Sequence, residues 1–445
     1  MKDALRAAFA TTLADLRARQ NEWTPRCLGM ARNHVARGGP VVLIAFGKAA
    51  RSMATSALAV LPAHRVRGLL VTPAPDDAPL PPLQTIAAGH PLPDGGSFAA
   101  ARAALALCHS VRPTEHVVFL VSGGGSALLE LPYDDRIDVA SWRAFYRALV
   151  GCGAGIERVN AIRRRVSAVK GGRLALAAAA AAGQTTVLVR DVPGNWGDIA
   201  SGPTWLADEG DASDDADPDD SSPWLDDAAL ARDLDALGLR AALPPQLAAD
   251  LAAGALPPRP RVPDRLPSKC AWLTLLSEEH ARAFAARAMT AAGYVVDAEA
   301  DADDLPVDAA ADALLQRLTA LRAAHPGRKV AVVTTGELSV ALPPSPGIGG
   351  RNQQFALACA RRIAGQPMAV LSAGTDGIDG AAPAAGAVVD GTTCARASAA
   401  GLDVAESMRR CDAHPLLAVL ADAITTGPTG TNVRDLRILA AAPEA

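Results

Sequence analysis

Aromatic residues are scarce in this sequence, and its cysteines form no recognisable pattern. Aromatic residues make up 4% of the 445 residues, and seven cysteines lie scattered without CxxC or Cys/His ligand spacing. The cysteine usage excludes a disulfide-stapled domain or a zinc site and predicts reduced thiols. Long apolar runs are also missing, because the most apolar stretch, residues 174–182, is far too short to span a bilayer.

No charge of one sign dominates the chain. Forty-three basic and forty-seven acidic residues give a net charge of −4, which argues against binding to nucleic acid or to a membrane surface. The N-terminal residues have helical apolar spacing, but Asp3 and Asp15 do not fit a signal peptide. We therefore expect a soluble cytoplasmic protein, and its length predicts two or three domains.

Lysine and asparagine are rare, and their positions are informative. Lysine occurs five times among the 43 basic residues, so arginine supplies most of the positive charge. Four of the six asparagines (Asn160, Asn195, Asn352 and Asn432) lie in polar clusters flanked by glycine. Lysine and arginine are not interchangeable at a specific site. A lysine or asparagine in a sequence that rarely uses these residues is therefore a candidate for a site that requires its particular shape.

A run of three glycines follows an apolar segment of strand length at residues 117–121. The run is Ser122-Gly123-Gly124-Gly125-Ser126. Glycine allows positive φ and close approach of the backbone to a ligand, and Ser126 can cap the following helix. The turn is either a cradle for phosphate or carboxylate at a helix N-terminus, or a tight strand-to-helix turn that binds nothing.

Two further charged residues follow predicted buried strands. Lys48 comes after the strand at 41–46, and Asp191 after the strand at 185–190. Ligands of open α/β sheets bind at the carboxyl ends of strands, where an acid is an ordinary metal ligand or general base. The alternative for Lys48 is a solvated lysine at a loop.

A basic helix over 156–182 is interrupted at Lys170-Gly171-Gly172, which suggests approach to a ligand or to another backbone.

The standard nucleotide-binding motifs are absent. Neither G-x-x-x-x-G-K-[ST] nor G-x-G-x-x-G with a following acid occurs.

Residues 207–220 are acidic and of low complexity, which predicts a surface loop. The proline-rich segment at 243–267 marks a domain boundary, so we predict domains 1–262 and 263–445. The second domain would begin with a strand at 271–275 and a helix capped by Ser277.

Eight motifs, taken together and in order, resemble the glycerate 2-kinase family, also called the MOFRL family and once misnamed hydroxypyruvate reductase. They are FGKAA, GHPLPDGGS, SGGGSALL, NAIRRRVSAVKGGRLA, DVPGNWGDIASGPT, GIGGRNQQ, GTDGIDG and TGPTGTNVRDL. The resemblance implies an α/β fold with a large Rossmann-like α/β/α N-terminal domain and a smaller α/β C-terminal domain. It also implies an active site in the cleft between them and transfer of the γ-phosphoryl of ATP to the 2-hydroxyl of D-glycerate.

The resemblance also implies roles for individual residues. The family's functional lysine and arginine fall on Lys48 and Arg351, and Asp191 and Asp376 are candidates for binding Mg²⁺ and for accepting the hydroxyl proton, with neither role assigned. The expected nucleotide-binding residues are Ser122, Gly123, Gly124, Gly125, Ser126, Lys170, Gly171, Gly172 and Glu337. The expected substrate-binding residues are Asn160, Asn352, Thr431 and Asn432.

The sequence departs from the family pattern at Arg190, Asn195 and Thr335 and in the acidic insert. These departures leave open an inactive relative that binds a sugar acid or a nucleotide, and the old family name leaves open an NAD(P)H-dependent hydroxypyruvate reductase. The expected partner is D-glycerate or a related 2-hydroxy acid. A homodimer is a further option, and neither nucleic acid nor a membrane is expected.

Overall fold

A computed structural model describes all residues except 74–78, 192–196, 206–223, 259–268, 300–301 and 444–445. The chain divides into two compact units. We call residues 20–275 the N-terminal unit, and residues 1–19 with 276–445 the C-terminal unit. Across the described part of the chain, no helix is long and apolar enough to cross a membrane. The acidic segment 207–220 and Asn195 lie outside the described residues.

The N-terminal unit is built on a six-stranded sheet in the order β3-β2-β1-β4-β5-β6. Its strands are β1 (Val41–Phe46), β2 (Val66–Thr72), β3 (Leu83–Ala87), β4 (His116–Val121), β5 (Gly183–Val189) and β6 (Lys269–Leu276). β1 pairs in parallel with β2 and β4, β2 with β3, and β4 with β5. This is the strand order of the doubly wound dinucleotide-binding fold, and it confirms the Rossmann-like prediction.

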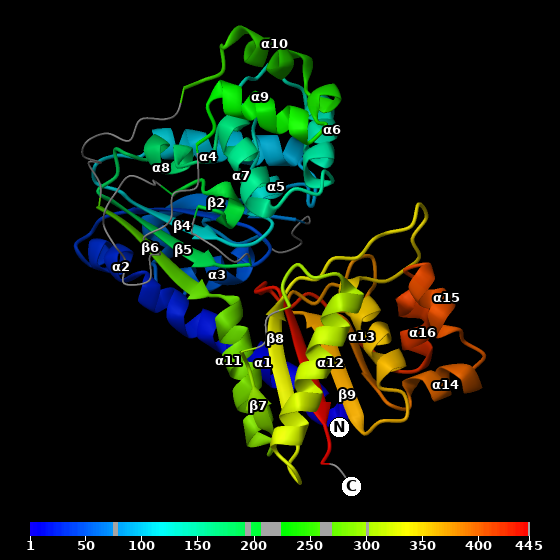
Figure 1. The fold of residues 1–445 in the computed structure, drawn as a ribbon. Helices are drawn as coiled ribbons and strands as arrows, with labels where there is room; N and C mark the ends of the chain where they lie inside the picture. Colours follow the sequence, from blue (N-terminus) through cyan, green and yellow to red (C-terminus); the bar gives the residue numbers. More distant parts are fainter. Residues whose placement is uncertain (74–78, 192–196, 206–223, 259–268, 300–301, 444–445) are drawn as a thin grey trace. The chain divides into compact units, whose positions relative to one another are not determined.

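Helices of this unit lie on both sides of the sheet (Figure 1). They are α2 (Gly29–Ala36), α3 (Ala50–Leu58), α4 (Gly95–His109), α5 (Gly125–Leu128), α6 (Val139–Val150), α7 (Ile156–Val166), α8 (Arg173–Ala177), α9 (Asp227–Ala236) and α10 (Pro245–Ala253). All six residues of β1 and of β4 are buried, as expected for central parallel strands covered on both faces. The core includes Phe46, Phe119 and Trp142.

The C-terminal unit contains a mixed sheet in the order β11-β10-β9-β12-β8-β7. Its strands are β7 (Val295–Asp297), β8 (Val330–Gly336), β9 (Met368–Gly374), β10 (Gly386–Asp390), β11 (Ala423–Ile424) and β12 (Asp435–Ala441). β12 lies antiparallel between β8 and β9, with Asp435 opposite both Gly336 and Gly374. Its first residue therefore lies where those two strands end.

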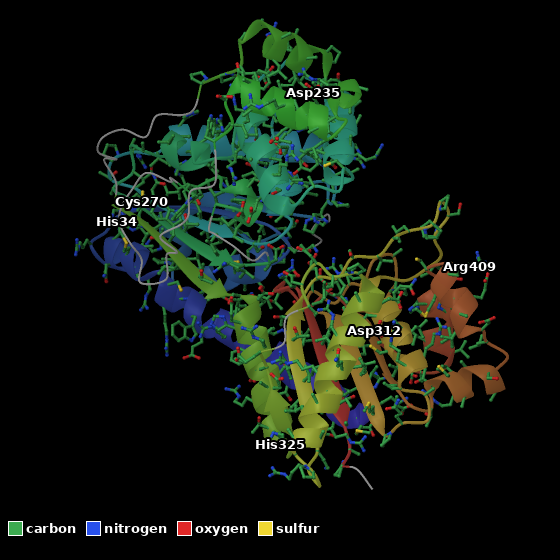
Figure 2. The ribbon with its side chains drawn as sticks, in the orientation of Figure 1. His34, Asp235, Cys270, Asp312, His325 and Arg409 are labelled. Atoms are coloured by element: carbon green, nitrogen blue, oxygen red, sulfur yellow. The ribbon has the colours of Figure 1, made fainter. Side chains whose placement is uncertain are left out.

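Helices cover both faces of this second sheet, with α12 in front and α1 behind in Figure 1. They are α1 (Lys2–Cys27, of which 2–19 belong here), α11 (Glu278–Ala291), α12 (Val307–Ala324), α13 (Arg351–Arg362), α14 (Thr393–Ala399), α15 (Val404–Arg409) and α16 (Ala413–Val419). Exposed side chains such as Arg409 on α15 point outward (Figure 2). The core includes Leu314, Val332, Phe355 and Leu439.

The start of the chain is anchored to the C-terminal unit by polar contacts. Lys2 Nζ lies 2.7 Å from Asp422 Oδ1, and Arg17 Nη2 donates to the Thr429 carbonyl at 3.2 Å. These contacts explain why the first 19 residues group with this unit. They also show why the boundary cannot be read from local composition, since the partners are some 400 positions apart in sequence.

Two expected elements differ from the structure. The strand expected at 271–275 is β6, and it extends the N-terminal sheet instead of opening the second domain. The helix expected over 156–182 is two helices, because α7 ends at Val166 and α8 covers only Arg173–Ala177. Between these two helices, Gly171 and Gly172 have φ values of +61° and +78°. This left-handed backbone conformation ends a right-handed helix. The N-cap expected at Ser277 is confirmed.

Candidate active site

Lys48 and the triple-glycine turn lie side by side in the N-terminal unit. They follow β1 and β4, the neighbouring strands between which the strand order reverses. Lys48 N donates to the Gly123 carbonyl at 2.8 Å, and Ala49 N donates to Ser122 Oγ at 3.0 Å. Because ligands of doubly wound sheets bind at this switch point, the two motifs occupy the position where a ligand is expected.

Glycine is required on both sides of this contact. Gly47 has φ +119°, and a Cβ there would lie 2.2 Å from Ser122 Oγ. Gly124 has φ +80°, and its Cβ would lie 3.0 Å from the His90 ring and 3.4 Å from Lys48 Cγ. The His90 ring therefore borders the same turn as the Lys48 side chain.

A buried chain of hydrogen bonds supports the turn from within. Ser126 Oγ and Ser201 Oγ are 2.9 Å apart, and Ser201 Oγ donates to Asn160 Oδ1 at 2.8 Å. Asn160 Nδ2 in turn donates to Asp198 Oδ1 at 3.2 Å. Ser201 and Asn160 are at most 1% exposed. Asn160, expected to bind substrate, is thus placed in the interior, and its described contacts tie it to the turn.

Lys170 is also interior. Its side chain is 1% exposed, and Nζ contacts the Ser126 carbonyl at 2.9 Å, the Leu129 carbonyl at 3.2 Å and Glu130 Oε2 at 3.2 Å. Burial lowers the pKa of Lys170, and the Glu130 carboxylate opposes that shift. An ammonium group has three donors, so these three contacts match its capacity. Lys170 therefore braces the segment after the glycine turn.

Asp191, Gly171 and Gly172 are the remaining residues of this unit that were expected in the site. Asp191 is the second residue after β5, and Arg190 is the first. Gly171 N and Gly172 N donate to the carbonyls of Ser201 and Gly202 at 3.2 and 2.7 Å. Gly171 and Gly172 were expected at the nucleotide, but their amide groups bind the protein backbone.

In the C-terminal unit, Arg351 lies between two carboxylates. It is the first residue of α13, its Nε donates to Asp435 Oδ2 at 2.6 Å, and its Nη2 lies 2.8 Å from Glu337 Oε1. Burial alone would lower the pKa of Arg351, but Asp435 and Glu337 outweigh it and raise that pKa above its usual value. The guanidinium is therefore held as a permanent positive charge.

Two more buried arginines, Arg437 on β12 and Arg434 just before it, belong to the same part of the C-terminal unit. Arg437 is fully buried, donates to the Gly336 carbonyl at 3.0 Å and lies 3.7 Å from Asp435 Oδ2. Arg434 has φ +68° and lies 5% exposed, with Nη1 donating to Asp303 Oδ2 at 2.7 Å. Sequence reasoning missed Asp435, Arg434 and Arg437 as candidates, although the first two lie within the last quoted motif.

The other expected residues of this unit gather around the same strand ends. Asp376 follows β9, and its Oδ1 accepts from Ile378 N at 3.0 Å. A Cβ on Gly374 would lie 3.0 Å from Asp376 Oδ1 and 3.5 Å from Asp435 Oδ1, so the two acids face the same point. Thr431 and Asn432 are at most 8% exposed and immediately precede the segment that leads into β12. Thr335, one of the departures from the family pattern, is buried within β8.

No metal centre is formed by protein side chains alone in the part of the chain that the structure describes. Mg²⁺ in phosphotransferases is commonly held by one or two carboxylates together with substrate phosphates and water. Asp191 and Asp376 each follow the carboxyl end of a strand and suit that kind of binding. Their part in holding Mg²⁺ stays a proposal.

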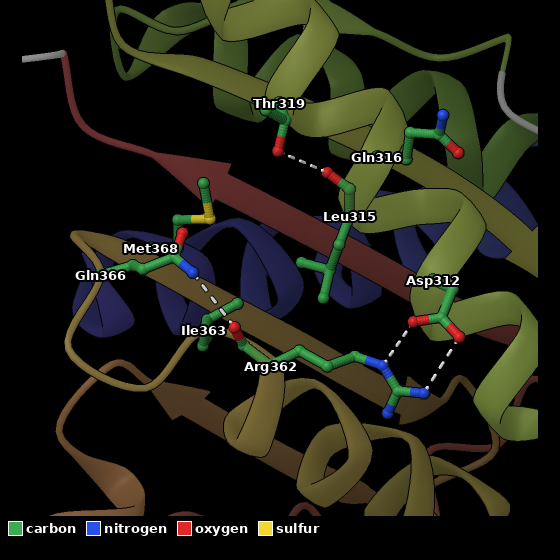
Figure 3. Close-up of a pocket in the computed structure, with 8 residues that line it drawn as sticks. All are labelled: Asp312, Leu315, Gln316, Thr319, Arg362, Ile363, Gln366 and Met368. Atoms are coloured by element: carbon green, nitrogen blue, oxygen red, sulfur yellow. Dashed lines mark hydrogen bonds and ion pairs between the residues drawn. The ribbon is translucent and has the colours of Figure 1, made fainter.

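A surface pocket of about 170 Å³ lies elsewhere in the C-terminal unit (Figure 3). It lies between α12 and the end of α13, where Arg362 Nε donates to Asp312 Oδ1 at 2.7 Å. Met368, the first residue of β9, lines it, whereas Asp376 follows the last residue of that strand. The pocket is thus at the opposite end of β9 from Arg351 and its carboxylates, and we do not assign it to the site.

The fold and these residue sets define a two-unit α/β protein with a Rossmann-like sheet and a mixed sheet. Residues 2–217 match a family described as a domain of unknown function, DUF4147, and residues 330–435 match the MOFRL family. D-glycerate 2-kinase of Thermotoga maritima is 32% identical over 409 residues, which cover 89% of this chain and 90% of that protein.

A protein of Agrobacterium vitis named putative hydroxypyruvate reductase is 34% identical over 406 residues, covering 90% of this chain and 87% of that protein. The crystal structure of glycerate kinase from T. maritima superposes with a TM-score of 0.76 at 29% identity, over 97% of this chain and 99% of that chain. The chain belongs to the glycerate 2-kinase or MOFRL family, which confirms the resemblance inferred from the eight motifs.

Proposed function

We propose that this protein transfers the γ-phosphoryl group of ATP to the 2-hydroxyl of D-glycerate, giving 2-phosphoglycerate and ADP. The observation that carries the proposal is the contact of Lys48 with the triple-glycine turn at the switch point of the Rossmann-like sheet. Family membership supports a kinase of glycerate type. The position of the phosphorylated hydroxyl is the finer step that the proposal adds.

The proposed chemistry needs mainly positioning and charge neutralisation. The substrate 2-hydroxyl oxygen forms the new bond to the γ-phosphorus, the bond from that phosphorus to the ADP oxygen breaks, and the hydroxyl proton passes to Asp191 or Asp376. Lys48 and Arg351 neutralise charge on the transferred group. Amide groups of residues 123–126 bind phosphate, except that of Gly125, which donates to the Ser122 carbonyl at 3.3 Å. Bound Mg²⁺ would supply further neutralisation of phosphate charge.

The buried residues have supporting roles in this proposal. Asn160 and Lys170 hold the glycine turn, and Asn352 holds the first turn of α13. Glu337 orients Arg351 through its contact with Nη2. We propose Thr431 and Asn432 as contacts to the glycerate, because they lie in the loop that leads into Asp435.

Product analysis by phosphorus NMR tests the proposal. Purified protein with ATP, Mg²⁺ and D-glycerate should give only the resonance of 2-phosphoglycerate. A product that is only 3-phosphoglycerate would contradict the proposed acceptor position. NADH oxidation with hydroxypyruvate, without ATP turnover, would instead favour the reductase, and calorimetric ADP–Mg²⁺ binding without turnover would favour an inactive binder.

A further inference from the structure

The first turn of α13 is capped by a carboxylate from a loop that follows β9. Asp379 Oδ1 accepts from Asn352 N at 3.0 Å, and Asp379 Oδ2 accepts from Gln353 N at 2.9 Å. These are the second and third residues of the helix, whose amide groups have no partner within the helix itself. Asp379 is 2% exposed. A buried side chain 26 to 27 residues away therefore holds the start of this helix.

The close approach of Gly350 to Asp379 is independent evidence for the contact between the Asp379 carboxylate and the start of α13. A Cβ at Gly350 would lie 2.2 Å from Asp379 Oδ1. The backbone of Gly350 is extended, with φ −153°, so its conformation is open to any residue and the requirement is steric. Ala381 N also donates to the Gly349 carbonyl at 3.1 Å. The segment before α13 and the 376–381 loop therefore fit closely together.

Arg351 is placed directly by this cap because it is the first residue of α13. Its side chain extends from the capped turn to Asp435 on β12 and to Glu337 after β8. Those two carboxylates belong to the sheet, whereas the guanidinium starts from the helix. A shift of the first turn would therefore move the guanidinium relative to both acids.

We infer that Asp379 is a positioning residue whose carboxylate fixes the first turn of α13 and thereby holds the Arg351 guanidinium between Glu337 and Asp435. The inference rests on the proposed function in one respect, that Arg351 serves phosphoryl transfer. Asp379 acts on the reaction only through Arg351. Asn352 shares this role, because its Nδ2 donates to Asp379 Oδ1 at 3.3 Å and its Oδ1 accepts from Ser372 Oγ at 2.6 Å.

The substitution Asp379→Asn tests the inference, because an amide keeps one acceptor oxygen and turns an NH₂ group toward the other helix amide. We expect kcat to fall by about 10²-fold, the cost of a small misplacement at a reacting centre, while KM for D-glycerate and ATP changes by less than about threefold. Amide hydrogen exchange at Asn352 and Gln353 should become faster.

Asp403→Ala is the control for loss of a helix cap. Asp403 caps α15 in the same unit, where its Oδ1 accepts from both Ala405 N at 2.8 Å and Glu406 N at 3.1 Å. This variant removes a carboxylate cap from a helix without an assigned site residue, so kcat should stay at the wild-type value. Equal losses in the two variants would mean that any lost cap lowers activity, and would overturn the inference.

Gly350→Ala approaches the same contact from the other side. Its new methyl group would displace the Asp379 carboxylate, so kcat should again fall, and the double variant should be no slower than the slower single variant. Additive losses would overturn the shared mechanism. If Asp379→Asn does not fold, Gly350→Ala with amide exchange still decides the question.

The two proposals fail in different ways. A wild-type protein without ATP turnover on D-glycerate would refute the proposed function, whereas unchanged amide exchange at Asn352 and Gln353 in Asp379→Asn would refute the cap. Wild-type kcat in Asp379→Asn with faster exchange would show that the cap exists but does not position Arg351, and this too would overturn the inference.

Discussion

Lys170 and Arg351 are both cations that the sequence assigned to the site, and their surroundings differ. Lys170 is 1% exposed, and its three contacts match the number of its donors. The Arg351 side chain is 35% exposed and is held between Asp435 and Glu337. A sealed cation stabilises the architecture, whereas a partly exposed cation at a sheet edge can meet a substrate.

The same contrast extends to the two units. In the N-terminal unit the candidate residues lie on main-chain turns, with Gly47 and Gly124 allowing close packing beside hydrogen-bonded side chains of Ser126, Ser201 and Asn160. In the C-terminal unit the candidate residues form ion pairs. Arg351 on α13 contacts Glu337 after β8 and Asp435 on β12, and Arg434 before β12 contacts Asp303. Main-chain turns present amide donors of fixed direction, while the ion pairs hold guanidinium charge in place.

The largest effect is expected from Lys170→Met, which tests whether this lysine is structural. The variant would leave the Glu130 carboxylate, itself 0% exposed, buried without its cation. Removing one partner of a buried ion pair typically costs about 3–5 kcal/mol. We expect a loss of this size in the free energy of unfolding, measured by denaturant titration.

The double variant Lys170→Met/Glu130→Leu serves as the control for that measurement. Replacing both partners by apolar residues removes the unpaired charge, so most of the lost stability should return. A Lys170→Met protein of wild-type stability with weaker ATP binding would instead show that Lys170 acts on the nucleotide.

The next largest effect is expected from Lys48→Arg, which should be nearly as damaging as Lys48→Ala. A Cβ at Gly124 would lie 3.4 Å from Lys48 Cγ, so the stem of Lys48 passes directly beside the glycine turn. A guanidinium is a wide planar fork, unlike a compact ammonium. We expect kcat to fall by about 10²–10³, the usual effect of losing one such electrostatic contact, with an unchanged melting temperature.

Lys329→Arg is the matched control, because Lys329 is an exposed lysine whose Nζ lies 5.7 Å from the centroid of the Tyr294 ring. It should keep the wild-type kcat. A Lys48→Arg enzyme within about threefold of wild type would show that charge alone is needed at that position.

Local features of the fold and site were predictable from the sequence. The strand at 41–46 matches β1, and the glycine turn and Ser277 cap lie where their patterns indicated, because apolar runs, glycines and caps act over a few residues. β12 was not predicted, since its seven residues include the buried Arg437, which interrupts the apolar pattern of a central strand.

Partners that are distant in sequence could not be predicted. Arg351 meets Asp435 across 84 positions, and Arg434 meets Asp303 across 131. Nothing in either segment identifies the other, because the contact depends on β12 inserting between β8 and β9. For the same reason the interior positions of Asn160 and Lys170 followed only from the structure. A polar residue beside a glycine-rich turn can equally face a ligand or the core.

The effect that is smallest per pH unit concerns the Asp379 cap. Burial raises the pKa of Asp379 from 3.8 to about 7, with a further contribution from Asp435 on β12, while the amide groups of Asn352 and Gln353 oppose the shift. Other charged or titratable groups of this region are Arg351 on α13, Asp376 in the same loop as Asp379, and His414 on α16. His414 Nδ1 lies 3.1 Å from Gln353 Nε2.

Because the folded-state pKa is raised, the folded protein binds an extra proton at Asp379 between about pH 4 and pH 7. The stability from this group is complete below about pH 4 and is lost as the pH rises through about 7, with a slope of at most about 1.4 kcal/mol per pH unit. Activity should change in the opposite direction, since only the ionised carboxylate accepts both helix amides. We therefore expect kcat to rise through about pH 7 while the unfolding free energy falls. Subtracting the Asp379→Asn profiles from the wild-type profiles isolates this group, and differences that do not change between pH 5 and 8 would show that Asp379 does not titrate there.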